Sequence, residues 1–511
     1  MGLQVESAAR GSRPSALPRP MPAPSGAPAL GIVILAAVVA AVVAGTWIVR
    51  APVETMAVVG ALGAFAAALM SPGSITVLAA FLLPISPEVP FFRISTELSV
   101  SQTGFSEVEA GLGVGDMLVL VGALGVLLKV LVSPSAARRL ASPLTVPIVA
   151  FWAMAAFSLA VQAETLPWSA LKICSMYLAR GIEVYAVYFV CLATVRDERT
   201  WRRVFGAFVF SGLIALALGI HDTLTVEYDE DGRLVSGFRM LQFYRGEFGN
   251  YMLLLTGLLL WLAWKSRNEM SRWGLRAAAL LAAVTVSFAT KRAIVIAAVV
   301  MLGATIWLVG RRYRSGAMVA LGVVLLATLF ALPAAVDRFA RTFEGGHEDI
   351  SNITGQAMDM GVAMDIAMAI DELPLDSSTR HRFLRWLTAL SAAWRSPLVG
   401  WGYYAASWQG FGFAHNQFLS ALAEMGVIGL AALVWFLRRL LRTLAGYMTR
   451  FDRPGPRALA LTLYPLTISL VVQSVFGDPF YYFKFMSIYW VAVGLLVTAG
   501  RIFPARPSLS R

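Results

Sequence analysis

The sequence predicts an all-α protein that crosses a membrane many times, with about 12–14 transmembrane helices. Of its 511 residues, 58% are hydrophobic and only 14% are charged, whereas a soluble domain carries about 25% charged residues. Several apolar runs also reach the roughly 20 residues that a helix needs to cross a bilayer. No long stretch has globular composition, so we expect no separate soluble domain.

The apolar runs give the predicted helices in chain order. They lie at 29–49, 54–70, 73–86, 115–132, 142–161, 172–194, 203–221, 249–264, 274–290, 293–310, 316–334, 414–437, 458–477 and 482–500. The third run is short, and the region 54–86 can be divided differently. The chain is thereby divided into a disordered tail at 1–28, helices within 29–334, one large loop at 335–413, helices within 414–500 and a tail at 501–511.

Basic clusters between the runs predict the orientation. With the first tail in the cytoplasm, these clusters all fall on the cytoplasmic side: Arg138-Arg139, Arg196 to Arg203, Lys265 to Arg276, Arg311 to Arg314, Arg438 to Arg442 and Arg501. An excess of Lys and Arg in cytoplasmic loops is the general pattern of membrane proteins. It accounts for the net charge of +12 without a nucleic-acid partner. The large loop 335–413 and a short turn near 477–482 then face the outer side.

Some basic residues fall near the outer edge of the membrane, against this pattern. Arg180 lies within the run 172–194, and Lys291 and Arg292 separate two runs on the outer side. Binding of a phosphate-bearing ligand would account for them, and snorkelling to lipid headgroups is the alternative. Three arginines of the second outer loop are further candidates, unless the acidic run at 227–231 simply neutralises them: Arg233, Arg239 and Arg245.

A polar motif opens the run that follows the large loop. His415, Asn416 and Glu424 stand there, although polar groups at membrane depth cost several kcal/mol unless paired. In a continuous helix Glu424 is about 13 Å from His415, so we expect it in the apolar zone, paired with a base or neutral. Structural alternatives exist: Asn416 can cap the helix, His415 can stand at its start, and Gly426 and Gly429 can allow close helix packing.

The residues singled out so far resemble the signature of the O-antigen ligase and polysaccharide polymerase superfamily of bacterial inner membranes. The matching elements are His415-Asn416-x-x-Leu419-x-x-x-x-Glu424-x-Gly426-x-x-Gly429, Arg382-x-x-x-Trp386, Ser396-Pro397-Leu398-Val399-Gly400-Trp401-Gly402, Thr290-Lys291-Arg292-Ala293, and Arg245-Gly246 ahead of Asn250. The chain departs from the family pattern at Lys291 and Ala293, and at Gly249, where the family usually has Pro. The resemblance is specific over about 290–430 and weaker elsewhere.

The resemblance implies a membrane glycosyltransferase with a GT-C-like fold, no cofactor and no metal. Its donor would be a glycan on undecaprenyl diphosphate, and its acceptor either lipid A–core, for a ligase, or another glycan, for a polymerase. The implied partners are the donor, the acceptor and the lipid bilayer. Other polysaccharide-assembly proteins are compatible with the resemblance, and no nucleic acid is implied. The implied location is the bacterial inner membrane, with the active site facing the periplasm.

The resemblance also assigns roles to residues. The implied catalytic residues are His415, which would orient or deprotonate the acceptor hydroxyl, and Arg292 and Arg180, which would hold the diphosphate. Substrate-binding candidates are Arg245, Arg239, Lys291, Arg382, Trp386, Asn416 and Glu424. A transporter or flippase of lipid-linked sugars is the alternative function, but the sequence shows no matching halves of the kind common in transporters.

Overall fold

The computed structural model describes residues 72–85, 88–95, 107–224, 245–287, 292–308, 377–406 and 414–503. The predicted runs 29–49, 54–70 and 316–334, the tail 1–28, most of the tail 501–511 and most of the large loop lie outside these residues. The helices are α3 (Pro72–Leu82), α5 (Val114–Val132), α6 (Pro134–Leu140), α7 (Thr145–Val161), α8 (Trp168–Thr194), α9 (Glu198–Leu224), α10 (Arg245–Lys265), α11 (Glu269–Ser287), α12 (Arg292–Leu308), α17 (Ser377–Arg395), α18 (Gln417–Tyr447), α19 (Pro454–Gln473) and α20 (Phe483–Ile502).

Every apolar run predicted within the described residues coincides with one of these helices. Seven of the described helices are long and apolar enough to cross a membrane, and the count is eight if α6 and α7, bent by 89°, form one broken span. The chain is therefore an α-helical protein that crosses the membrane several times. Two features were not predicted: the amphipathic helix α17 inside the large loop, and an antiparallel hairpin of β1 (Glu88–Ser95) and β2 (Glu107–Gly113).

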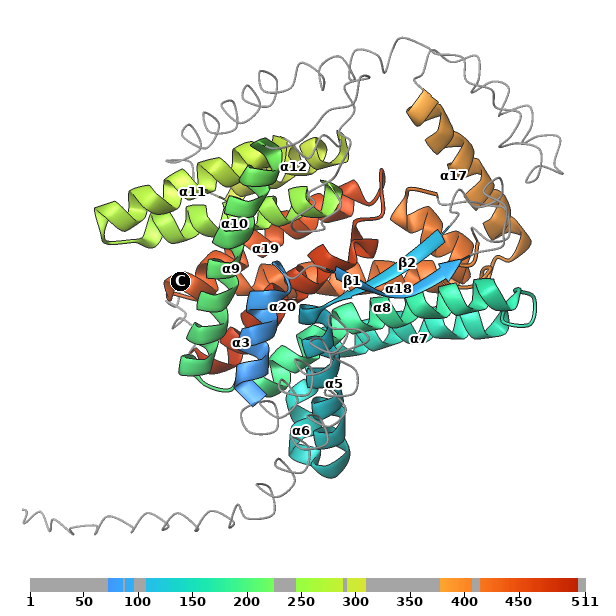
Figure 1. Ribbon diagram of the computed structural model, residues 1–511, viewed down its shortest axis with the longest axis horizontal. Helices are drawn as coiled ribbons and strands as arrows, with labels where there is room; N and C mark the ends of the chain where they lie inside the picture. The colour runs from blue at the N-terminus through green and yellow to red at the C-terminus, as the bar shows by residue number, and fades with distance from the viewer. Residues whose placement is uncertain are drawn as a thin grey trace, which may run out of the picture. The chain divides into compact units, whose positions relative to one another are not determined.

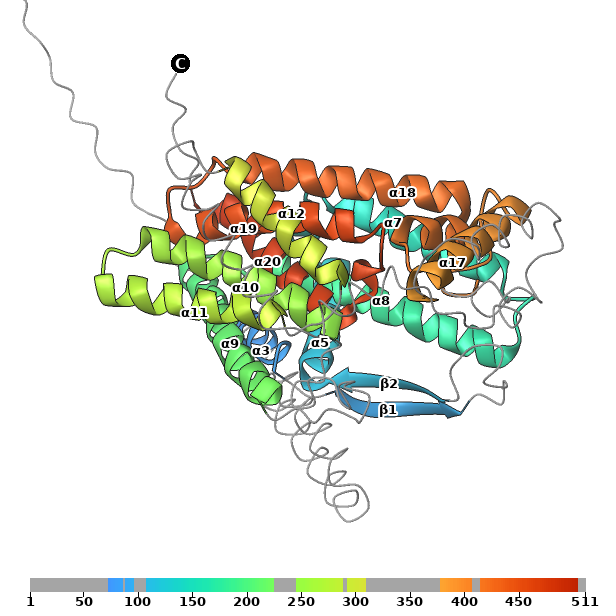
Figure 2. The same ribbon diagram turned by 90° about the horizontal axis from the view of Figure 1, so that it is seen from above.

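The helices α7, α8, α18 and α20 run side by side in two views at right angles (Figures 1 and 2), with α18 packed on α7 and α20 packed on α8. Their shared core is aromatic. Tyr185 lies 5.3 Å from Trp152 and 4.6 Å from Trp490 between ring centroids. Large rings from four helices meet there, since Phe436 of α18 lies 5.9 Å from Trp490. Such contacts add to the stabilisation that burial alone provides.

The helix α18 is broken at Gly426, where φ is 66° and ψ is −169°, a backbone conformation that essentially only glycine adopts. Its 31 residues would extend about 46 Å as one straight helix, far more than the roughly 30 Å of hydrocarbon in a bilayer. The segment after the break, 427–447, is about 31 Å long and spans by itself. We call residues 417–425 α18a and residues 427–447 α18b. The expectation of one continuous helix from His415 into the membrane was wrong.

Residues 397–402 fill the break in α18. Three backbone hydrogen bonds join the two segments: Trp401 N–H to Ala423 O at 3.0 Å, Gly402 N–H to Glu424 O at 2.9 Å, and Val427 N–H to Pro397 O at 2.8 Å. A helix break leaves backbone donors and acceptors without intrahelical partners, and burial makes such groups costly. The segment 397–402 supplies those partners. We call the paired segments 397–402 and 423–427 the interlock.

The end of α7 completes the interlock. The Ser158 hydroxyl lies 2.8 Å from Val399 O and 2.6 Å from Glu424 O, so it bridges the two segments. The side chain of Gln162 donates to Gly400 O at 3.1 Å. The break in α18 is therefore fixed at the level where α7 ends.

We expect alanine at Gly400 or Gly426 to disrupt the interlock. Both residues have positive φ, and an added Cβ at Gly400 would overlap the backbone of Glu424, while one at Gly426 would overlap Leu398. The left-handed backbone alone costs about 1–2 kcal/mol for an L side chain. Thermal unfolding in detergent should show a clear loss of stability for either variant. Gly446→Ala is the matched control on α18b, because its Cβ would meet no atom within 4 Å, and equal stability of Gly426→Ala and Gly446→Ala would refute the interlock.

Candidate functional site

The half-helix α18a lies on the turn between α19 and α20. The backbone N–H of Gln417 donates to Ser474 O at 2.8 Å and reaches Gly477 O at 3.3 Å. The start of α18a therefore sits at the ends of α19 and α20, and its other end, at the interlock, sits at the end of α7. We call this end of the bundle the His415 end.

His415 precedes α18a in a left-handed conformation, with φ of 50°, which histidine tolerates better than most residues. This turn lets Asn416 cap the half-helix: its side-chain oxygen accepts from Phe418 N–H at 3.0 Å and from Leu419 N–H at 3.1 Å. The predicted N-cap at Asn416 is confirmed. The His415 side chain remains 55% exposed, so a substrate can reach it.

Asp478, in the turn between α19 and α20, faces His415. Its Oδ2 lies 4.0 Å from His415 Nδ1, within ion-pair distance when the imidazole is protonated. Its Oδ1 accepts a hydrogen bond from Ser420 Oγ at 3.2 Å, which fixes the carboxyl beside α18a. Burial raises the pKa of Asp478 to about 7, opposed in part by the Ser420 hydrogen bond. The pair therefore offers acid–base chemistry near neutral pH.

Glu424 is buried among tyrosines. Its Oε2 accepts from the Tyr481 hydroxyl at 3.0 Å, and its carboxylate also interacts with the backbone of Tyr404. Burial and the nearby Glu424 carboxylate hold the pKa of Tyr481 well above its ordinary value, so this hydroxyl remains a donor. Tyr404 in turn stacks on Tyr177 of α8, with ring centroids 3.8 Å apart. The partner of Glu424 is thus a phenol and not a base, so of the two states that we expected the neutral carboxyl is the one that remains.

Arg180 of α8 is engaged by two carboxylates. It donates to Asp116 of α5 at 2.8 Å and to Glu183, one turn along α8, at 2.5 Å. The guanidinium is only 11% exposed. The two carboxylates oppose its charge, so a phosphate would compete with Asp116 and Glu183 for Arg180.

The start of α10 meets the turn that carries Asp478. A Cβ placed on Gly246 would lie 2.9 Å from the Tyr482 hydroxyl, so the turn of α10 that begins with Arg245 lies against Tyr482. Asp478, Glu247 and Arg382 all act electrostatically on Tyr482. Arg382 of α17 is therefore within electrostatic range of the turn that faces His415.

Other predicted site residues are placed less completely. Arg292 is the first residue of α12, which packs on α19, but its side chain and that of Arg245 are not described. Lys291, Arg233 and Arg239 lie outside the described residues.

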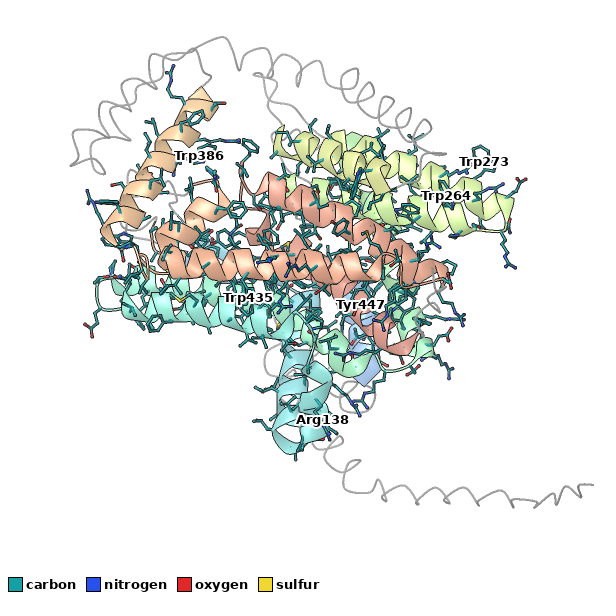
Figure 3. All side chains as sticks on the ribbon, turned by 180° about the vertical axis from the view of Figure 1, so that it is seen from behind. Arg138, Trp264, Trp273, Trp386, Trp435 and Tyr447 are labelled. Atoms are coloured by element: carbon teal, nitrogen blue, oxygen red, sulfur yellow. The ribbon has the colours of Figure 1, made fainter. Side chains whose placement is uncertain are left out.

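Two tryptophans in and after α17 differ in their bonding. Trp386 (Figure 3) packs edge-on against Phe383 at 5.2 Å, and its buried indole nitrogen has no hydrogen-bond partner within the part of the chain that the structure describes. Trp401 instead donates to Ala392 O at 2.8 Å. Trp401 therefore ties the interlock to α17, whereas the Trp386 N–H is buried and has no partner among the described residues.

Sequence analysis missed a buried cluster of carboxamides at the His415 end. The side chain of Asn250 donates to Gln473 at 3.1 Å, and Gln417 lies next to Ser474 through its backbone. One amide atom of each of the three side chains has no partner among the described residues, although buried polar groups are normally paired. Ordered water or a sugar hydroxyl would satisfy them. The sequence signal for this cluster was the presence of Gln417 and Gln473 within apolar runs.

Asp478 was also missed, because the short turn that contains it was interpreted only as a connection. Its signal was a carboxylate beside Pro479 in a turn of few residues on the same predicted side as His415. Among the described residues, no group of three or more His, Cys, Asp and Glu side chains is placed to hold a metal ion.

We expect Tyr481→Phe to destabilise the protein, because it removes the hydroxyl that donates to the buried Glu424 carboxylate. An unsatisfied buried acceptor costs about 1–3 kcal/mol, which thermal unfolding in detergent would detect. Adding Glu424→Gln should recover part of that loss of stability, since a neutral amide is less costly to bury than an ionised carboxylate. Tyr464→Phe, at a half-buried position in α19, serves as the control. If Tyr481→Phe unfolds at the same temperature as this control, the hydroxyl does not support Glu424.

Residues 277–434 match the family model described as O-antigen ligase. The matched segment runs from α11 through α12 and α17 into α18b, and it contains His415, Glu424 and the interlock. Among curated proteins, none matches the chain significantly in sequence. The chain therefore carries an O-antigen ligase family domain.

Proposed function

We propose that this protein transfers a glycan from undecaprenyl diphosphate to an acceptor hydroxyl at the periplasmic face of the bacterial inner membrane. The family domain assigns activity of the O-antigen ligase or polymerase type in polysaccharide assembly, and the donor and the side of the membrane are our proposal. The observation that supports it best is the exposed His415 beside Asp478, at the end of a membrane-spanning bundle.

The geometry favours His415 as the general base. Its Nδ1 faces Asp478, so Nε2 is the ring nitrogen that would accept the proton of the acceptor hydroxyl. The acceptor oxygen then bonds to the anomeric carbon while the bond from that carbon to the phosphate oxygen breaks. The electron pair leaves with undecaprenyl diphosphate. The Asp478 carboxylate stabilises the imidazolium that forms, as a carboxylate does in other acid–base pairs of this kind.

The diphosphate needs cationic partners as its charge grows. We assign this role first to Arg292 and Arg245, at the starts of α12 and α10, with Lys291 and Arg239 as further candidates. Arginine suits the role because its planar fork binds two phosphate oxygens at once. Arg180 would contribute in competition with Asp116 and Glu183.

The glycan would lie against α17, where Arg382 offers hydrogen-bond donors and Trp386 an aromatic ring. Asn416 and Glu424 have their side-chain oxygens engaged, by the helix cap and by Tyr481 respectively. We therefore assign them the positioning of His415 and Asp478 rather than direct binding of sugar.

The acceptor decides between ligase and polymerase, and a chromosomal deletion distinguishes the two. Electrophoresis of the surface glycans should show loss of all polymer on lipid A–core if the protein is a ligase. A single repeat unit left on the core would instead identify a polymerase. An unchanged glycan profile would count against both.

We expect His415→Ala and His415→Gln to be about equally inactive, because glutamine can hydrogen-bond but cannot accept a proton at neutral pH. The loss should be roughly 10²–10⁴ in rate, measured with purified protein and a lipid-diphosphate donor. His221→Gln is the matched control, since His221 is similarly exposed, at 56%. Substantial activity of His415→Gln would leave His415 an orienting role only.

The transfer rate should rise with pH through about 7, as Asp478 loses its proton and begins to stabilise the imidazolium.

The free energy of unfolding should change with pH in the opposite direction to the transfer rate. The pKa of Asp478 is about 7 when folded and near its ordinary value of 3.8 when unfolded, so the folded state holds the proton longer and stability falls between about pH 4 and 7. A pH–rate profile and thermal unfolding at several pH values measure the two effects. Both dependences should weaken in Asp478→Asn, and an unchanged pH–rate profile in that variant would exclude this role.

A further inference from the structure

The helix α17 has two apolar faces. One face packs against α18a: Leu384, Ala389 and Ala392 are each no more than 3% exposed. Ala389 and Ala392 belong to a small cluster with Ala406, Ala414 and Ala423. This face fixes α17 on the half-helix that follows His415.

The opposite face of α17 is apolar and exposed. Phe383 is 37% exposed, Leu390 46% and Trp394 77%. With Leu387 these residues fall at spacings of four, three and four, so they share one stripe about 60° wide on a helix of 3.6 residues per turn. No charged residue lies within that stripe. A helix with charged flanks and such a stripe is typical of helices that lie in a membrane interface.

The stripe continues onto the lipid-facing surface of α18b. Pro397 accepts a hydrogen bond from Val427 N–H at 2.8 Å, so the residues that follow α17 abut the first turn of α18b. There Leu398 is 62% exposed and Val427 50% exposed. Because α18b is a membrane span, this surface contacts lipid, and the exposed face of α17 extends it.

We propose that the exposed face of α17 lies in the headgroup–acyl boundary of the leaflet at the His415 end. Trp394 stands at the end of the stripe, followed by the exposed Arg395. Tryptophan prefers the membrane interface, and arginine can reach the phosphates there. Figure 1 and Figure 2 both show α17 at one end of the helices that it caps, running obliquely to them.

Lipid contact would hold α17, and through it α18a, at a constant depth. This constant depth also sets the height of His415 above the membrane in which the donor is anchored. A half-helix held at the lipid surface keeps the base at the height where a lipid-linked anomeric carbon is presented. That consequence for His415 rests on the proposed function, whereas the contact of α17 with lipid does not depend on it.

Spin labels on single cysteines test the proposal in the full chain reconstituted in lipid nanodiscs. Cys174 and Cys191 are fully buried and are replaced by alanine. Labels go to Leu390→Cys and Trp394→Cys on the stripe, to Val434→Cys as the lipid reference on α18b, and to Arg395→Cys on the polar side of α17. Collisional relaxation by oxygen, which concentrates in lipid, is compared with relaxation by a water-soluble nickel chelate.

The proposal predicts that positions 390 and 394 resemble position 434, with high access to oxygen and low access to nickel, while position 395 shows the reverse. High nickel access at 390 and 394 would place the stripe in water and overturn the proposal. Low access to both reagents would mean that protein, either a partner or another segment of this chain, covers the stripe, and would overturn it as well.

Discussion

The backbone pairing between residues 397–402 and 423–427 is the constraint on which the rest of the site depends. A helix that begins at Gln417 and ends at Tyr447 is too long for one bilayer crossing. The break at Gly426 divides it into a span and a half-helix, and the break persists because another segment satisfies its backbone groups. Gly400 and Gly426 are both required, since a side chain on either would meet the backbone of the other segment.

The charged residues discussed above fall into two groups. Glu424 and Arg180 are engaged within the protein, the first by Tyr481 and the second by Asp116 and Glu183. His415 and Asp478 approach each other with weaker restraint, at 4.0 Å, and His415 stays accessible. This distribution fits a site in which the engaged ionic groups maintain geometry while the accessible pair carries out proton transfer. It also explains why a carboxylate nine residues after His415 is not a direct partner of the histidine.

The sequence was sufficient for the helices, because a span needs a long apolar run and each run in the described residues became a helix. It was also sufficient for the cap at Asn416, which depends only on local spacing. The break at Gly426 could not be predicted, since a glycine in an apolar run fits close packing as well as a positive φ. The pairing of His415 with Asp478 was missed because 63 residues of sequence separate them and only the docking of α18a on the turn before α20 brings them together. The apolar residues of the stripe on α17 are visible in the sequence, but they were not interpreted as a helix because they lie within a predicted loop of almost eighty residues.

A double-mutant cycle on the transfer rate tests whether the broken helix brings His415 to Asp478 so that the two residues act as one unit. The rates of His415→Ala, Asp478→Asn and the double variant are compared with the wild type, using purified protein and a lipid-diphosphate donor. If Asp478 acts through His415, the double variant is no slower than His415→Ala alone. Losses of rate that multiply in the double variant would show that the two residues act independently, and would contradict a role of Asp478 that acts through His415.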